Sequence, residues 1–161
     1  MSKTEEAILQ EYRQHVASLY DSVRAWAQKA SLSIDEREIE LFEEAAGKYM
    51  LTALILRDEK SRQLAEIRPI AAWVLAAKGR VDLIGQFAQE ILVYLEQGGP
   101  VITIARNPGN GGEQTTRPLY KGIAQAGWYW MENTRLKKAH ALNQEVFFDL
   151  LAEVSDYEFP A

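Results

Sequence analysis

The fold is decided by a central stretch that reads Leu64-Ala-Glu-Ile-Arg-Pro-Ile-Ala-Ala-Trp-Val-Leu-Ala-Ala-Lys-Gly-Arg-Val-Asp-Leu-Ile-Gly85. Two apolar runs, residues 71–76 and 80–84, flank the pair Lys78-Gly79. Runs separated by such a short polar loop predict a β-hairpin, although lysine is not the usual first residue of a two-residue turn and a longer connection stays open. Pro69 is expected at a strand start or a sheet edge, because proline cannot donate a ladder hydrogen bond.

The β pattern continues on both sides of this hairpin. We expect further strands at residues 37–43, 49–57, 90–96, 100–105 and 127–130, although the region 33–46 also suits a short helix. Strands that follow one another without a helix between them pair in an antiparallel meander. Residues 106–117 are almost all turn formers and predict a loop.

Helices are expected at the two ends of the chain. Apolar residues recur every three or four positions between residues 4 and 29, which predicts a long amphipathic helix capped by Thr4. A second helix is expected after Asn143, with Leu142 stapled onto Phe147. The predicted fold class is therefore α+β. A long N-terminal helix packs on a curved antiparallel β-meander, followed by a C-terminal helix, within a single globular domain of residues 1–161.

Composition limits the classes of partner. The 161 residues include 18 basic and 23 acidic side chains and no cysteine. This acidic balance argues against nucleic acid as a partner. The chain has no apolar run of the roughly 20 residues that a membrane span needs, and its N-terminus does not resemble a signal peptide. Without cysteine there is no thiolate metal site, and the two histidines lack zinc-ligand spacing. We expect a cytoplasmic protein without metal or cofactor.

One motif suggests metal-dependent chemistry. The segment Gly79-Arg-Val-Asp-Leu-Ile-Gly85, followed by residues 90–96, resembles part of the core of restriction-endonuclease-like (PD-(D/E)xK) nucleases. In that family an Asp and an acid-x-Lys pair hold a metal ion and activate water. Asp82 matches the first position, whereas Tyr94 and Glu96 stand where the second acid and the lysine belong. A hydrolase would require Asp82 to meet two further carboxylates; the acids to check are Glu90, Glu96 and Glu40.

A second resemblance concerns the layout of the chain. Pro69-x3-Trp73 ahead of the same Gly79–Gly85 segment is similar to a hairpin in small uncharacterised bacterial α+β proteins. Those proteins share an N-terminal helix and a late aromatic strand before the final helix. The resemblance implies this arrangement and a bacterial source, and it implies no chemistry.

Aromatic and basic residues in the second half are candidates for binding. Trp128 and Trp130 share one face of their strand, with Tyr120 nearby, and can stack on a ligand or anchor a partner. Packing in the core explains at least one tryptophan equally well. Arg106 and Arg117 bracket the glycine-rich segment and can bind an anion, although this segment lacks the lysine of a phosphate-binding loop.

Acidic residues supply the leading functional hypothesis. Glu36, Glu38 and Glu40 alternate along a predicted strand and project from one face, which is typical of a solvated face or of an acidic patch for a basic partner. Since no complete catalytic constellation is visible, the sequence favours a non-enzymatic binding or accessory module, such as an immunity- or inhibitor-like protein directed at a basic toxin.

Two alternatives and one further interaction remain open. One alternative is the metal-dependent hydrolase or nuclease centred on Asp82. The other is a small-ligand pocket of about 300 Å³ or more between the first helix and the sheet. Its expected lining is Trp26, Trp73 or Trp128. The apolar stripe of the first helix can also support a homodimer.

Overall fold

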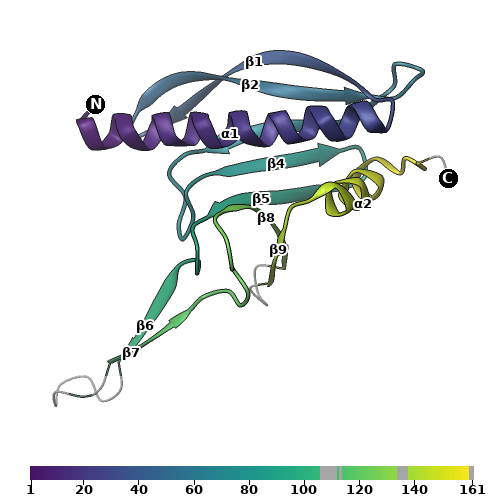
Figure 1. Ribbon diagram of the computed structural model, residues 1–161. Helices are drawn as coiled ribbons and strands as arrows, with labels where there is room; N and C mark the ends of the chain where they lie inside the picture. Colours follow the sequence, from purple (N-terminus) through teal and green to yellow (C-terminus); the bar gives the residue numbers. More distant parts are fainter. Residues whose placement is uncertain (106–111, 113, 134–137, 160–161) are drawn as a thin grey trace.

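A seven-stranded antiparallel sheet with two helices on one face confirms the α+β class. The computed structural model describes residues 1–105, 112, 114–133 and 138–159. Figure 1 shows the sheet, in the order β1-β2-β3-β4-β5-β8-β9, and a separate two-stranded arm of β6 and β7 that projects from it. The elements are α1 (Lys3–Lys29), β1 (Ser33–Glu43), β2 (Gly47–Arg57), β3 (Gln63–Ala71), β4 (Arg80–Gly85), β5 (Gln89–Leu95), β6 (Val101–Ala105), β7 (Gln114–Pro118), β8 (Gly127–Asn133), β9 (Lys138–Ala141) and α2 (Gln144–Ser155).

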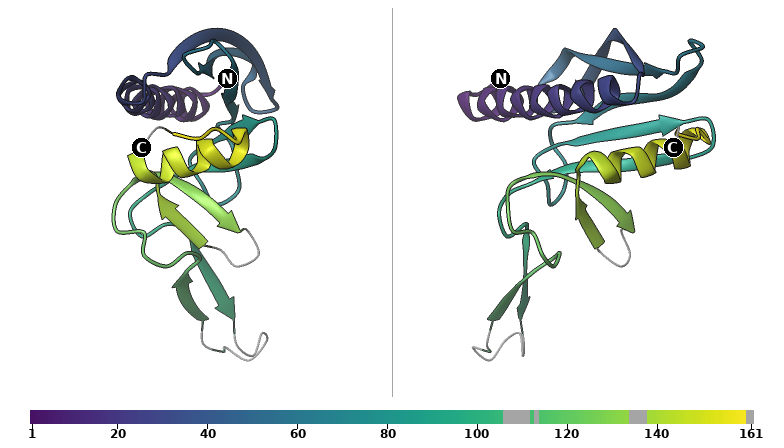
Figure 2. Two further views of the ribbon diagram at one scale, coloured as in Figure 1. Left: turned by 90° about the vertical axis from the view of Figure 1, so that its right-hand side faces the viewer. Right: turned by 45° about the vertical axis from the view of Figure 1, so that its right-hand side comes forward.

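The sheet curls around α1. In the end-on view of Figure 2, β1 and β2 arch over the helix, and Figure 1 shows β4 and β5 on its other side. The predicted cap at Thr4 was wrong: Ser2 caps α1 through a reciprocal capping box with Glu5. Tyr12, fully buried, donates its hydroxyl to the carbonyl of Arg80 at 2.7 Å, which fixes the helix against β4.

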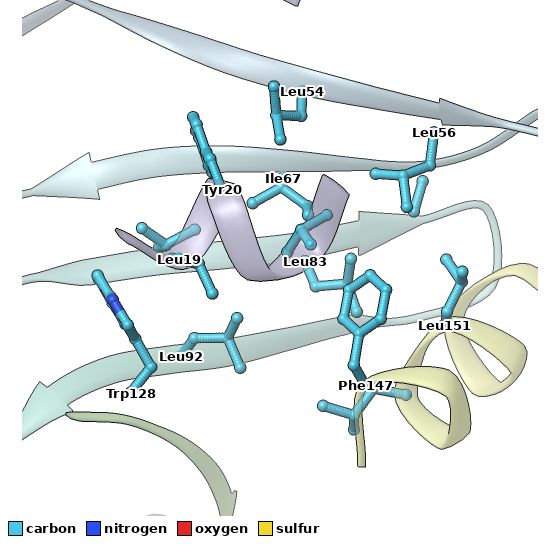
Figure 3. Packing of buried hydrophobic residues seen from close by; sticks show 14 of the residues in the cluster. Leu19, Tyr20, Leu54, Leu56, Ile67, Leu83, Leu92, Trp128, Phe147 and Leu151 are labelled. Carbon is cyan, nitrogen blue, oxygen red and sulfur yellow. The ribbon is translucent and has the colours of Figure 1, made fainter. Parts of the chain in front are cut away.

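The core lies between the two helices and the sheet. Figure 3 shows Leu83 and Leu92 of the sheet packed with Phe147 and Leu151 of α2, and all four side chains are at most 1 % exposed. Trp26 of α1 contacts the Phe147 ring, with centroids 5.3 Å apart. The two helices therefore share one core, as their apolar stripes require.

The central hairpin forms with a connection longer than two residues. β3 ends at Ala71, so the strand expected over residues 71–76 was wrong. Residues 72–79 form the connection, and an isolated bridge between Val74 and Ala77 closes its tip. Gly79 has φ +143°, and a Cβ there would lie 2.4 Å from the Tyr12 ring, so close packing on α1 explains this glycine.

Two short strands, β7 and β9, were not predicted. β7 occupies the end of the predicted 106–117 loop, and β9 lies in a basic stretch without a strand pattern. Every residue of β7 is exposed, so no apolar alternation marks it. Pro69 lies neither at a strand start nor on an edge strand, because it falls late in β3, a central strand. The proline is tolerated there because the β2 ladder covers only residues 63–67 of β3, so no N–H is needed from position 69 on that side.

Candidate functional site

Asp82 lies buried on the sheet face that points away from the helices. Its neighbours Val81 and Leu83 belong to the core, so alternation places Asp82 opposite them. Arg80 donates to both carboxylate oxygens, at 2.8 and 2.9 Å, and Gln89 Nε2 donates to Oδ2 at 2.6 Å. These contacts satisfy the carboxylate within the protein.

The acids proposed to join Asp82 point elsewhere. Glu90 accepts a 2.7 Å hydrogen bond from the Trp130 indole, Glu96 lies 3.9 Å from the ammonium of Lys78, and Glu40 is on β1. Within the described residues, no group of three His, Asp or Glu side chains is arranged to hold a metal ion. The geometry therefore lends no support to the alternative of a metal-dependent hydrolase.

The two tryptophans of β8 have structural contacts. Trp128 is 8 % exposed, and its indole donates to the carbonyl of His15 on α1 at 2.8 Å. Trp130 is half-buried and stacks on His140 of β9, with ring centroids 5.2 Å apart. Trp128 is therefore a core residue, whereas Trp130 orients the ring of His140.

The small-ligand alternative also lacks support from the packing. Trp26 and Trp128 lie within or against the core between α1 and the sheet. A pocket lined by Ile8, Glu11 and Trp73 does touch α1, and its volume is about 120 Å³. This volume is below the roughly 300 Å³ at which small-molecule sites begin.

The structure brings Arg117 and Tyr120 together at the base of the arm. Both line a pocket of about 550 Å³, together with Lys121. Burial raises the pKa of the Tyr120 hydroxyl, which therefore stays protonated at neutral pH. Arg106, the other predicted anion ligand, lies outside the described residues.

The three predicted acidic residues are all exposed on β1, but they have different surroundings. Glu36 forms an ion pair with Arg24 of α1. Glu38 and Glu40 are in no ion pair within the part of the chain that the structure describes. They share their strand face with Phe42, which is 71 % exposed.

The register of β1 and β2 defines a surface that we call the hairpin face. Glu38 lies opposite Thr52, Glu40 opposite Met50, and Phe42 opposite Lys48. Met50 is 45 % exposed, so two large apolar side chains lie side by side next to two carboxylates. The hairpin face consists of Glu38, Glu40, Phe42, Lys48, Met50 and Thr52.

The sequence prediction missed Phe42 and Met50, although a signal was present. The buried residues of this part of the hairpin are Ile39, Leu41 and Tyr49, which cluster with Leu9 of α1. Phe42 and Met50 are out of phase with these inward positions. An apolar residue on the polar phase of a strand indicates an exposed hydrophobic side chain.

The inner side of the hairpin is held firmly. Arg13 of α1 donates to the carbonyl of Met50 at 2.7 Å and lies over the Tyr49 ring. Tyr49 donates its hydroxyl to Glu43, whose carboxylate also accepts the backbone N–H groups of Ala72 and Trp73. Burial, and then the carboxylate of Glu43, raises the pKa of Tyr49, which keeps the hydroxyl protonated as a donor.

No family model, curated protein or solved structure matches the chain. Both resemblances drawn from the sequence therefore stay predictions. None of the described helices is long and apolar enough to span a membrane.

Proposed function

We propose that this protein is a non-enzymatic binding module that recognises a basic protein partner through the hairpin face. One observation carries the proposal: Phe42 and Met50 are exposed beside Glu38 and Glu40 on a surface that α1 supports from behind. Aromatic and methionine side chains are enriched in protein interfaces, where a few of them supply most of the binding energy.

The pairing of the two apolar side chains distinguishes this surface from ordinary exposure. Single exposed hydrophobic residues are normal on soluble proteins. Val101 and Ile104 of β6 are also exposed, but their spacing directs them to opposite faces of the strand. Phe42 and Met50 occupy diagonal positions on one face, a spacing at which aromatic and long side chains are within reach of each other.

The carboxylates indicate the charge of the partner. Exposed charges on an edge strand such as β1 also protect a protein against edge-to-edge aggregation, so Glu38 and Glu40 alone would not require a partner. The exposed side chains of Phe42 and Met50 do not contribute to this protection against aggregation. Glu38 and Glu40 outnumber Lys48, the one cation of the face, so the face keeps a net negative charge. This charge matches a basic partner, for which it raises the association rate and disfavours acidic competitors.

The rigidity of the hairpin adds to this argument. Contacts from Arg13 and Glu43 fix the strand backbone and the adjacent connection before any partner arrives. A preorganised surface loses less conformational entropy on binding. The narrower proposals of an immunity- or inhibitor-like role, a bacterial source, a cytoplasmic location and homodimerisation rest on the sequence alone.

Site-specific photo-crosslinking tests the proposal in a lysate of the source organism. Photoreactive benzoylphenylalanine replaces Phe42 in one variant and Phe87 in a matched control, since Phe87 is also 64 % exposed but lies in the β4–β5 turn. We expect position 42 to crosslink to one protein with a basic surface, identified by mass spectrometry, and position 87 not to crosslink to it.

The outcomes are distinct. Crosslinking that is lost when Glu38→Lys and Glu40→Lys are added supports the proposal. Equal crosslinking from both positions, no crosslinking, or an acidic product contradicts it.

A further inference from the structure

A second pocket lies between the arm and the last strand of the sheet. Its volume is about 430 Å³, and its lining includes the basic residues Arg117, Lys121 and Lys138 together with His140. Arg117 and Lys121 come from β7 and the residues directly after it, and Lys138 and His140 come from β9, so the fold gathers these groups from two separate parts of the chain. This basic pocket shares no residue with the hairpin face.

The charge of the basic pocket stands out in an acidic protein. The chain carries a net charge of -5, yet three permanent cations converge on this one concavity. In the part of the chain that the structure describes, Arg117, Lys121 and Lys138 form no ion pair. Cations held around a concave surface concentrate anions from solution.

One acid lies beside the basic pocket and is already engaged. Glu132 accepts a hydrogen bond from His140 Nε2 at 2.7 Å, and one face of the His140 ring stacks on Trp130. The hydrogen bond from His140 holds the pKa of Glu132 below its usual range, and the charge of Lys138 adds to this effect. Glu132 is therefore ionised at neutral pH and reduces the local positive charge without cancelling it.

We infer that the basic pocket binds a small organic phosphate. A phosphate monoester carries close to two negative charges at neutral pH, as phosphorylated side chains do, and its oxygens suit the planar fork of Arg117 together with two lysines. The remaining lining includes Ile102, Leu119 and Ala139, which offers apolar contact to the organic part. The volume lies within the range of small-molecule sites.

A polynucleotide fits these observations less well. Nucleic-acid binders present basic residues along a continuous face that follows many phosphates. Here the cations surround a single pocket, and the opposite end of the molecule carries the acidic hairpin face. The ligand is therefore expected to have one phosphate group and a compact body.

Titration calorimetry on the full chain tests this inference. The probes are inorganic phosphate, a nucleoside 5′-monophosphate, the same nucleoside without phosphate, and a long single-stranded oligonucleotide. We expect the monophosphate to bind more tightly than inorganic phosphate and the nucleoside not to bind. Arg117→Gln and Lys138→Gln should each weaken binding by about tenfold, the effect of losing one charge-assisted hydrogen bond.

Lys60→Gln provides the matched control, because Lys60 is an exposed lysine in the β2–β3 turn and its loss changes the net charge equally. Unchanged binding by Lys60→Gln and by Glu38→Lys supports a pocket that is independent of the hairpin face. The inference is overturned if the control weakens binding as much as Arg117→Gln does. It is also overturned if only the oligonucleotide binds, or if the wild-type protein, folded by circular dichroism, binds neither inorganic phosphate nor the monophosphate.

Discussion

At the scale of the residue, Asp82 shows how a carboxylate that resembles a catalytic group can be structural. It is 1 % exposed and receives three hydrogen bonds from Arg80 and Gln89. A buried polar group needs such partners, because burial without them costs several kilocalories per mole. The position of Asp82 is thus explained by the stability of the sheet face that points away from the helices.

Asp82→Ala should lower the free energy of unfolding by about 1–3 kcal/mol, because Arg80 and Gln89 then lose their shared acceptor. Urea denaturation of both proteins measures the difference. Addition of Mg²⁺ or Mn²⁺ should leave both transitions unchanged. A metal that stabilised the wild type and not the variant would contradict this structural role and favour the hydrolase alternative.

Glu90 provides a second prediction, which depends on pH. Burial raises the pKa of Glu90, the hydrogen bond from Trp130 partly offsets this, and the charge of Glu153 on α2 raises it further. A carboxyl whose pKa is higher in the folded state makes that state bind more protons, so its contribution to stability falls as pH rises from the unfolded to the folded pKa.

Glu153→Gln removes the like charge and should therefore stabilise the protein at pH 7 by about 0.3 kcal/mol, the size of a like-charge pair on a helix. The gain should shrink at pH values near 4, where carboxyl groups become protonated. Thermal melts at both pH values provide the measurement, with Glu158→Gln as the exposed control. A gain that does not depend on pH would refute the coupling with Glu90.

At the scale of the element, the sequence predicts the helices better than the connections. The apolar stripe marks α1 because one helix face contacts a continuous core. The 72–79 connection depends on Glu43, which accepts backbone N–H groups some thirty residues later in the chain. Such a contact between distant residues leaves no periodic signal in the local sequence.

The candidate site was also predictable only in part. Alternation along β1 correctly places Glu38 and Glu40 among exposed positions. The same alternation places Phe42 on the exposed face, but its proximity to Met50 depends on the register of β1 and β2, which the pattern of either strand alone does not contain. The basic pocket depends on β7 and β9, two strands that have no apolar alternation.

The predicted N-cap of α2, Asn143, can be tested by substitution. Its side chain accepts the N–H of Val146 at 2.8 Å, as predicted for a helix cap. Asn143→Ala should lower the free energy of unfolding by about 1 kcal/mol. Asn143→Ser should keep most of the wild-type stability, because serine is an equally good cap. Equal stability of the alanine variant and the wild type, measured by urea denaturation, would contradict the capping role.

At the scale of the whole molecule, the fold separates two surfaces of opposite character. The hairpin face belongs to β1 and β2, whereas the basic pocket is lined from β6, β7 and β9. Figure 1 shows these two groups of strands on opposite sides of β4 and β5. The hairpin face is backed by the cluster of Leu9, Ile39, Leu41 and Tyr49, whereas the basic pocket is lined from the arm and β9. Such an arrangement can bind a basic protein and a small anion independently.

The affinity of the crosslinked partner tests the central claim most directly. Calorimetry would compare the wild type, Glu38→Lys/Glu40→Lys, and the control Glu59→Lys/Glu158→Lys, which changes the net charge by the same amount at exposed acids elsewhere. We predict that the hairpin variant binds at least about tenfold more weakly, a loss of roughly 1.4 kcal/mol, while the control binds nearly as tightly as the wild type. Equal affinities for the two variants would contradict recognition through the hairpin face.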